Sequence, residues 1–179
     1  MDTLFFWTLG ATIVLLAASG ILLAISAHKK KQAATEAFAR EGAQKTAASG
    51  DLWLDENNRK WLIAREGTNL PVHRYDSVRC AELSENGVRY IWNDNNIVSA
   101  EDEHAWPPSE EHAQEVGMNG KKQAISLCLN IFTDDVVYPV ETLVLLSRPC
   151  ARTSKAYRDA AAHAAALMHF FNTMHSNAQ

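Results

Sequence analysis

Cysteine is scarce in this chain. Only Cys80, Cys128 and Cys150 occur among its 179 residues. An odd number of cysteines without a Cys-x-x-Cys pair does not form the pattern of a disulfide framework or of a zinc site. Unpaired cysteines of this kind are typical of proteins in a reducing cytosol.

Sequence motifs of catalysis are missing as well. The chain contains no GxSxG, HExxH or P-loop sequence, so no serine hydrolase, zinc protease or nucleotide-binding loop is indicated. Cys150 stands two residues before Arg152, which is the only hint of an activated thiol. We therefore expect no catalytic residue, no cofactor and no metal.

A surplus of basic residues is also lacking. Lysine and arginine together number 17 against 21 acidic residues, and the net charge is −4. A nucleic-acid-binding domain needs a basic face. Nucleic acid is therefore not an expected partner.

The histidines do not form a ligand set. His163, His169 and His175 are six residues apart, so on a helix each is rotated about 120° from the last and they cannot share one ion. His104 and His112 each follow a glutamate in an acidic segment. Solvated charge explains that pair as well as a divalent metal would.

One long stretch contains no charge at all. Residues 4–27 are almost entirely apolar, and His28, Lys29, Lys30 and Lys31 follow at once. About 20 apolar residues span a bilayer, so this run predicts a transmembrane helix with a basic flank. A cleaved signal peptide would have a basic start, which the sequence lacks, and a buried core helix is rarely this long without charge.

The basic flank predicts an orientation. Lysines remain on the cytoplasmic side of a span, so we expect the N-terminus outside and the rest of a single-pass protein inside. Gly20 and Ala24 form a small-xxx-small pair that would allow self-association through the span. The predicted organisation is a membrane helix with its flank over residues 1–31, an Ala-rich helical stalk over 32–50, and one domain over 51–179.

The residue pattern of the domain predicts several strands followed by one helix. Asn86 and Gly87 predict a hairpin turn, and alternating apolar residues such as Leu127 and Leu129 predict a half-buried strand. Strands are expected at 52–54, 60–63, 78–83, 88–92, 125–131 and 140–146. Ser154 is a plausible cap for an amphipathic helix running to about residue 175, and residues 94–119 form an acidic, irregular excursion.

Several of these segments resemble a bacterial domain of unknown function with a pleckstrin-homology-like (PH-like) fold. The resemblance rests on DLWLDE at 51–56, YDSV at 75–78, AELSENG at 81–87, and the last helix with Tyr157, Ala164 and Leu167. It covers residues 51–93 and 123–174. Two hairpins, further strands and one closing amphipathic helix predict an α+β protein, an antiparallel β-barrel or sandwich closed by the C-terminal helix, and a PH-like module has the same order of elements. The predicted span would place it at a bacterial inner membrane. The resemblance implies no catalytic residues.

The function expected from these features is binding. A membrane-anchored cytoplasmic adaptor would take a protein or peptide at a sheet edge, in the groove beside the last helix, or on the acidic excursion, where Trp106, Pro107 and Pro108 are candidate contacts. One alternative is a phosphoinositide- or anionic-lipid-binding module, although the basic residues of the domain are diffuse. Another is an enzyme with an unrecognised active site.

Overall fold

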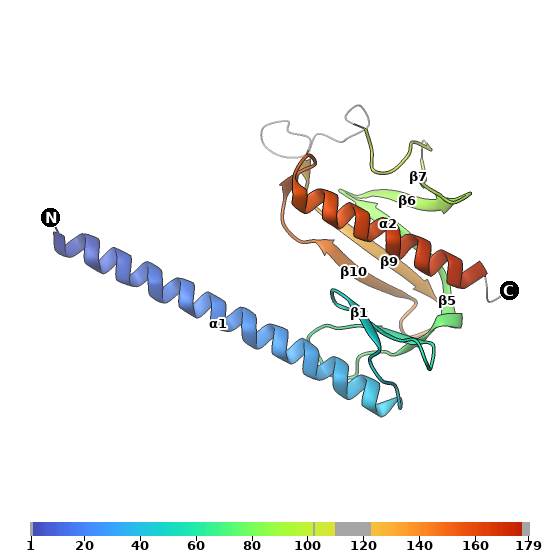
Figure 1. Ribbon diagram of the computed structural model, residues 1–179, viewed down its shortest axis with the longest axis horizontal. Helices are drawn as coiled ribbons and strands as arrows, with labels where there is room; N and C mark the ends of the chain where they lie inside the picture. The colour runs from blue at the N-terminus through green and yellow to red at the C-terminus, as the bar shows by residue number, and fades with distance from the viewer. Residues whose placement is uncertain (1, 102, 110–122, 177–179) are drawn as a thin grey trace. The chain divides into compact units, whose positions relative to one another are not determined.

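The computed structural model describes residues 2–101, 103–109 and 123–176 (Figure 1). The chain forms two compact units, Met1–Val72 and His73–Gln179. The division falls at residue 72, within the segment that the sequence assigned to one domain.

The first unit joins a long helix to a small antiparallel sheet. Helix α1 runs over Asp2–Arg40, and the strands are β1 (Ala47–Ser49), β2 (Leu52–Asp55) and β3 (Lys60–Ile63). β2 pairs with both β1 and β3. The predicted hairpin of residues 52–63 is thus confirmed, whereas β1 occupies the end of the segment 32–50, which the sequence assigned to a stalk.

The core of the first unit lies between the last turns of α1 and this sheet. Ala34, Ala37 and Phe38 are buried at three- and four-residue steps. The Phe38 ring meets Trp53 edge-on, with ring centroids 6.2 Å apart. The small alanine side chains allow the helix backbone to approach the strands, and Phe38 packs in the same cluster as Trp53, Leu62 and Leu70.

The expected membrane span over residues 4–27 is wrong. In the part of the chain that the structure describes, no helix is long and apolar enough to cross a membrane. α1 runs on through residues 28–40, and its last turns pack in the core just described. The expectations of a single-pass protein, an integral membrane partner and an inner-membrane location rested on that span and are corrected with it.

The second unit is a five-stranded antiparallel sheet under one helix. Its elements are β4 (His73–Arg74), a 3₁₀ turn η1 (Tyr75–Ser77), β5 (Val78–Glu85), β6 (Val88–Asn93), β7 (Asn96–Ser99), β8 (Gln123–Ala124), β9 (Leu127–Thr133), β10 (Val140–Leu146), β11 (Cys150–Ala151) and α2 (Lys155–Ser176). The strand order of the main sheet is β10-β9-β5-β6-β7, and β8 pairs with β11. Helix α2 packs mainly on the central strand β5 (Figure 1).

Period-two patterning explains which face of the sheet α2 covers. Leu143, Leu129, Leu83 and Tyr90 are register partners across β10, β9, β5 and β6, and all four are buried. Facing them, α2 presents a stripe that includes the buried Phe171. Ser154 caps the helix as predicted, since its Oγ accepts a hydrogen bond from the Tyr157 N–H at 3.2 Å.

The predicted barrel or sandwich is wrong. Within the described residues the main sheet is open, with β10 and β7 as its two ends. The hairpin of residues 52–63, which a closed arrangement would need, pairs with β1 in the first unit. The α+β content and the antiparallel pairing agree with the expectation, but the second unit has one open main sheet with a helix across it.

The turn at Asn86 and Gly87 is confirmed and has a second role. Both residues have positive φ, 53° and 90°, as the tight β5–β6 turn requires. The Asn86 side chain also donates to the Gln123 carbonyl at 2.8 Å and accepts from the Ile125 N–H at 2.8 Å. One amide thereby holds the segment just before β9 against the turn that follows β5.

Candidate functional site

A buried carboxylate organises one end of the second unit. Glu85 closes β5, and its side chain is fully buried. It accepts hydrogen bonds from Trp106 Nε1 at 2.8 Å and from the Tyr157 hydroxyl at 3.0 Å. Arg152 Nη2 lies 2.9 Å from the other carboxylate oxygen. Three separate segments of the chain, carrying Glu85, Trp106 and the pair Arg152 and Tyr157, thus meet at one carboxylate.

The strand pattern places Glu85 inward. Ala81 and Leu83 precede it at two-residue steps and are buried on the same face of β5. A charged group at this depth is stable only when it is paired and hydrogen-bonded, which Arg152 and its neighbours provide. The Glu85 network is therefore a structural anchor for the loop that carries Trp106 and for the first turn of α2.

The electrostatics of this network keep Tyr157 protonated. Burial raises the pKa of its hydroxyl well above the ordinary value, and the charge and hydrogen bond of Glu85 raise it further. The Arg152 guanidinium lies 5.9 Å from the centre of the Tyr157 ring and lowers the pKa only in part. Tyr157 is therefore a hydrogen-bond donor to Glu85 and not a base.

Next to this network a groove opens beside α2. Its volume is about 490 Å³, a size common in ligand sites. It is lined by Trp92, Asn95, Asn96, Ile97, Trp106, Pro107, Tyr157, Arg158, Ala161, Ala162 and Ala165. Trp106 and Tyr157 turn their polar ends to Glu85. The rings of both residues therefore contribute apolar surface to the groove, and Asn95, Asn96 and Arg158 contribute its polar groups.

The structure brings two of the three predicted partner-binding residues to this groove. Trp106 and Pro107 line it, whereas Pro108 is half-buried and is not among its lining residues. Residues 104–106 are held by β7: the Ser99 N–H donates to the His104 carbonyl at 2.8 Å. β7 lies inside the segment that the sequence described as irregular, while residues 102 and 110–119 of that segment lie outside the described residues.

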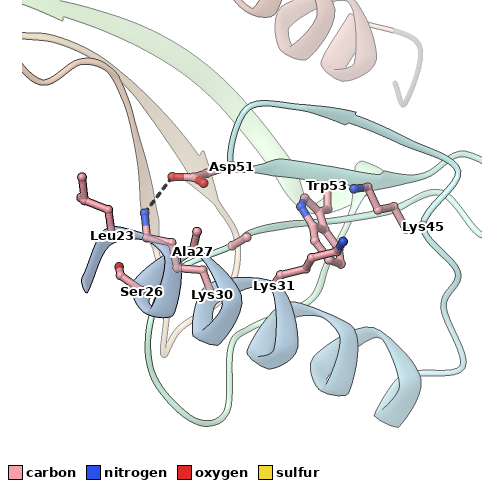
Figure 2. A pocket seen from close by; sticks show the side chains of 9 residues that line it. Leu23, Ser26, Ala27, Lys30, Lys31, Lys45, Asp51 and Trp53 are labelled. Atoms are coloured by element: carbon pink, nitrogen blue, oxygen red, sulfur yellow. Dashed lines mark hydrogen bonds and ion pairs between the residues drawn. The ribbon is translucent and has the colours of Figure 1, made fainter. Parts of the chain in front are cut away.

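A second candidate site belongs to the first unit and involves the basic flank. Lys30 and Lys31 line a pocket of about 480 Å³ together with Leu23, Ser26, Ala27, Lys45, Asp51, Trp53 and Ala64 (Figure 2). His28 and Lys29 are exposed and do not line it. Two of the four flank residues therefore belong to a pocket that the sequence did not predict.

Two histidines of the second unit, His73 and His104, lie close to polar side chains of the same unit. His73 is buried, with Nε2 3.6 Å from Glu141 and Nδ1 3.9 Å from Asp135. The His104 ring hydrogen-bonds the Tyr90 hydroxyl at 3.3 Å, and His112 lies outside the described residues. In that described part of the chain no cluster of three or more His, Cys, Asp or Glu side chains could hold a metal.

Sequence reasoning missed Glu85, Arg152 and the pocket lysine Lys45. The position of Glu85 could have been found, because it continues the period-two face of Ala81 and Leu83. Arg152 and Lys45 lie outside regular elements, where no periodicity applies. In comparisons with known proteins, no family model, curated protein or solved structure matches the chain.

Proposed function

We propose that this protein is a non-enzymatic binding module whose groove beside α2 takes a short peptide. The observation that carries the proposal is the orientation of Trp106 and Tyr157. Both donate their polar hydrogens to Glu85, so their rings offer a rigid apolar surface to the groove. Aromatic surface held in place in this way binds at little cost in side-chain entropy.

The side chains of the groove favour binding over catalysis. Its titratable lining residues are Tyr157 and Arg158. Acid–base catalysis needs a group with a pKa near the working pH, while the pKa of Tyr157 is raised far above neutrality by burial and by Glu85. Arginine remains protonated throughout the physiological range.

The shape of the groove suggests the kind of peptide. Ala161 and Ala165 lie one helical turn apart on α2 and leave room that a larger side chain would fill. A bulky apolar residue of the peptide fits above them, against Trp106. Arg158 is exposed at the groove, where it would pair with an acidic residue or a terminal carboxylate of the peptide.

The test is to fill the groove. Ala162 is exposed and lines the groove, so Ala162→Trp should occupy it without disturbing the core. Peptides are first selected from a random library with the wild-type protein, and their affinities are then measured by fluorescence anisotropy. We expect Ala162→Trp to weaken binding at least tenfold.

Ala156→Trp is the matched control. Ala156 is exposed on the same helix but does not line the groove, and because it lies six residues before Ala162, the helix receives the same residue about 120° around its axis. Binding to this variant should stay within twofold of wild type. Equal affinities of the wild type and Ala162→Trp would contradict the proposal.

A further inference from the structure

The pocket of the first unit contains more positive than negative charge. Lys30, Lys31 and Lys45 line it, and Asp51 is the one carboxylate among its lining residues. Lys30 Nζ lies 3.1 Å from Asp51 Oδ2, which neutralises one lysine. Lys31 and Lys45 have no carboxylate partner among the described residues.

One of the two unneutralised lysines lies over the aromatic ring of the pocket. Lys45 Nζ lies 4.1 Å from the centre of the Trp53 ring. Lys31 lines the same pocket from α1, and Figure 2 shows the Lys30–Asp51 pair away from Trp53. A cation–π contact at an exposed site is weak, so both ammonium groups remain able to pair with an anion.

The scaffold around these lysines is well ordered by packing. Trp53 is buried against Phe38 in the core of the first unit. Asp51 also accepts the Ala64 N–H at 2.7 Å through its main-chain carbonyl. Trp53 and Ala64 therefore form a fixed wall of the pocket. The ammonium groups of the lining lysines are on longer side chains and can adjust to a ligand.

We infer that this pocket binds a phosphate monoester that carries an apolar or planar group. The lining residues give a net charge of two positive units, and a phosphate monoester has nearly two negative charges at neutral pH. Lys31 and Lys45 would hold the phosphate, and the apolar part of the ligand would lie along Leu23, Ala27 and Trp53. This inference involves only the first unit and is independent of the peptide groove.

The soluble arm of the test uses phenyl phosphate and the full chain. The readout is the indole N–H resonance of Trp53 in ¹⁵N-labelled protein, assigned from a Trp53→Phe variant. We expect a saturable shift with phenyl phosphate and none with benzyl alcohol, which lacks the charge. No saturable shift with phenyl phosphate and no lysine-dependent vesicle binding, taken together, would overturn the inference.

Three variants separate a built site from general attraction to a basic surface. Lys31→Gln with Lys45→Gln should weaken binding by roughly tenfold or more, because each removes a charge-assisted contact to the phosphate. Lys29→Gln removes a neighbouring lysine outside the pocket and should leave binding unchanged. Asp51→Asn removes the carboxylate and should strengthen binding. Equal losses in the Lys29 and Lys31/Lys45 variants would overturn the inference, as would weaker binding by Asp51→Asn.

The vesicle arm distinguishes the source of the phosphate. Binding of the wild type and of the Lys31/Lys45 double variant is compared on phosphatidylcholine vesicles with and without phosphatidic acid, a lipid monoester. A lysine-dependent gain with phosphatidic acid supports a lipid source, and lysine dependence for phenyl phosphate alone supports a soluble source. Binding that does not depend on Lys31 and Lys45 in either arm would overturn the site.

Discussion

Removing the Glu85 carboxylate should destabilise the second unit strongly. Glu85→Leu leaves Arg152 without its carboxylate and leaves the Trp106 and Tyr157 hydrogens without an acceptor. Breaking a buried ion pair from one side costs about 3–5 kcal/mol. Since Arg152 retains 14% side-chain exposure, water relieves part of this cost, and we expect a loss near the lower limit, about 3 kcal/mol.

The measurement is urea unfolding. With a slope of about 2 kcal/mol per molar, a loss of about 3 kcal/mol lowers the midpoint by about 1.5 M. The double variant Glu85→Leu with Arg152→Met should recover at least about 1 kcal/mol relative to Glu85→Leu, because it also removes the unpaired cation. A higher stability of the double variant than of Glu85→Leu would show that the unpaired Arg152 causes the loss of stability.

Glu82 provides the matched control. It lies on the same strand and pairs with Arg89 at 2.8 Å, a distance close to that between Glu85 and Arg152. The Arg89 side chain is 62% exposed, and exposed pairs contribute about 0–1 kcal/mol. Glu82→Leu should therefore cost less than about 1 kcal/mol. The reasoning is refuted if Glu85→Leu unfolds at the same urea concentration as Glu82→Leu, or if adding Arg152→Met deepens the loss.

Two further predictions concern pH. Burial and Glu85 raise the pKa of Tyr157, so the folded state holds this proton more tightly than the unfolded state. The stability that the proton contributes is present below about pH 10 and is lost as the pH rises above that value. Tyr157→Phe should therefore flatten the alkaline loss of stability, measured as the urea midpoint across the pH range. For Asp55, burial alone would raise the pKa, but hydrogen bonds from the Asn58 side chain and from the main-chain N–H groups of Gln44, Asn58 and Asn57 together lower it. The stability that the Asp55 carboxylate contributes is present above about pH 4 and is lost as the pH falls through the lowered pKa. Asp55→Asn should therefore lose less stability in acid than the wild type, and an equal acid loss in both proteins would contradict this.

The sequence predicted elements well where side-chain periodicity was strong. The alternating strand predicted at 125–131 corresponds to β9 at Leu127–Thr133, and the helix predicted from Ser154 to about residue 175 matches α2. In both cases the pattern arises because one face packs against the unit's own core. Local patterns of this kind need no knowledge of the partner element.

The errors came from inferences about the environment of a segment. The uncharged run over residues 4–27 indicated a membrane span, yet α1 continues into the core of the first unit. The barrel required strands from residues 52–63 and from the second unit to close together. No local pattern states which strands share a sheet. The barrel was inferred from the order of hairpins, strands and closing helix, and the observed open sheet corrects it.

The candidate sites were predictable only in part. Trp106 and Pro107 were selected because an aromatic residue and prolines stood in an acidic segment, and both line the groove beside α2. Lys30 and Lys31 were selected as a flank, and their place in a pocket depends on Lys45, Asp51 and Trp53, which come from other segments. A site assembled from separate elements leaves no contiguous motif.

The Glu85 network has a consequence for the time course of folding during synthesis. Tyr157 follows Glu85 by 72 residues, so at about 5–20 residues per second the ribosome needs roughly 4–14 s to supply this donor. During that interval the central strand of the sheet carries a carboxylate on its inner face without its final partners. A charge in that position disfavours pairing with the apolar strands of other chains. The same side chain that anchors the finished unit would thus protect the nascent strand from aggregation.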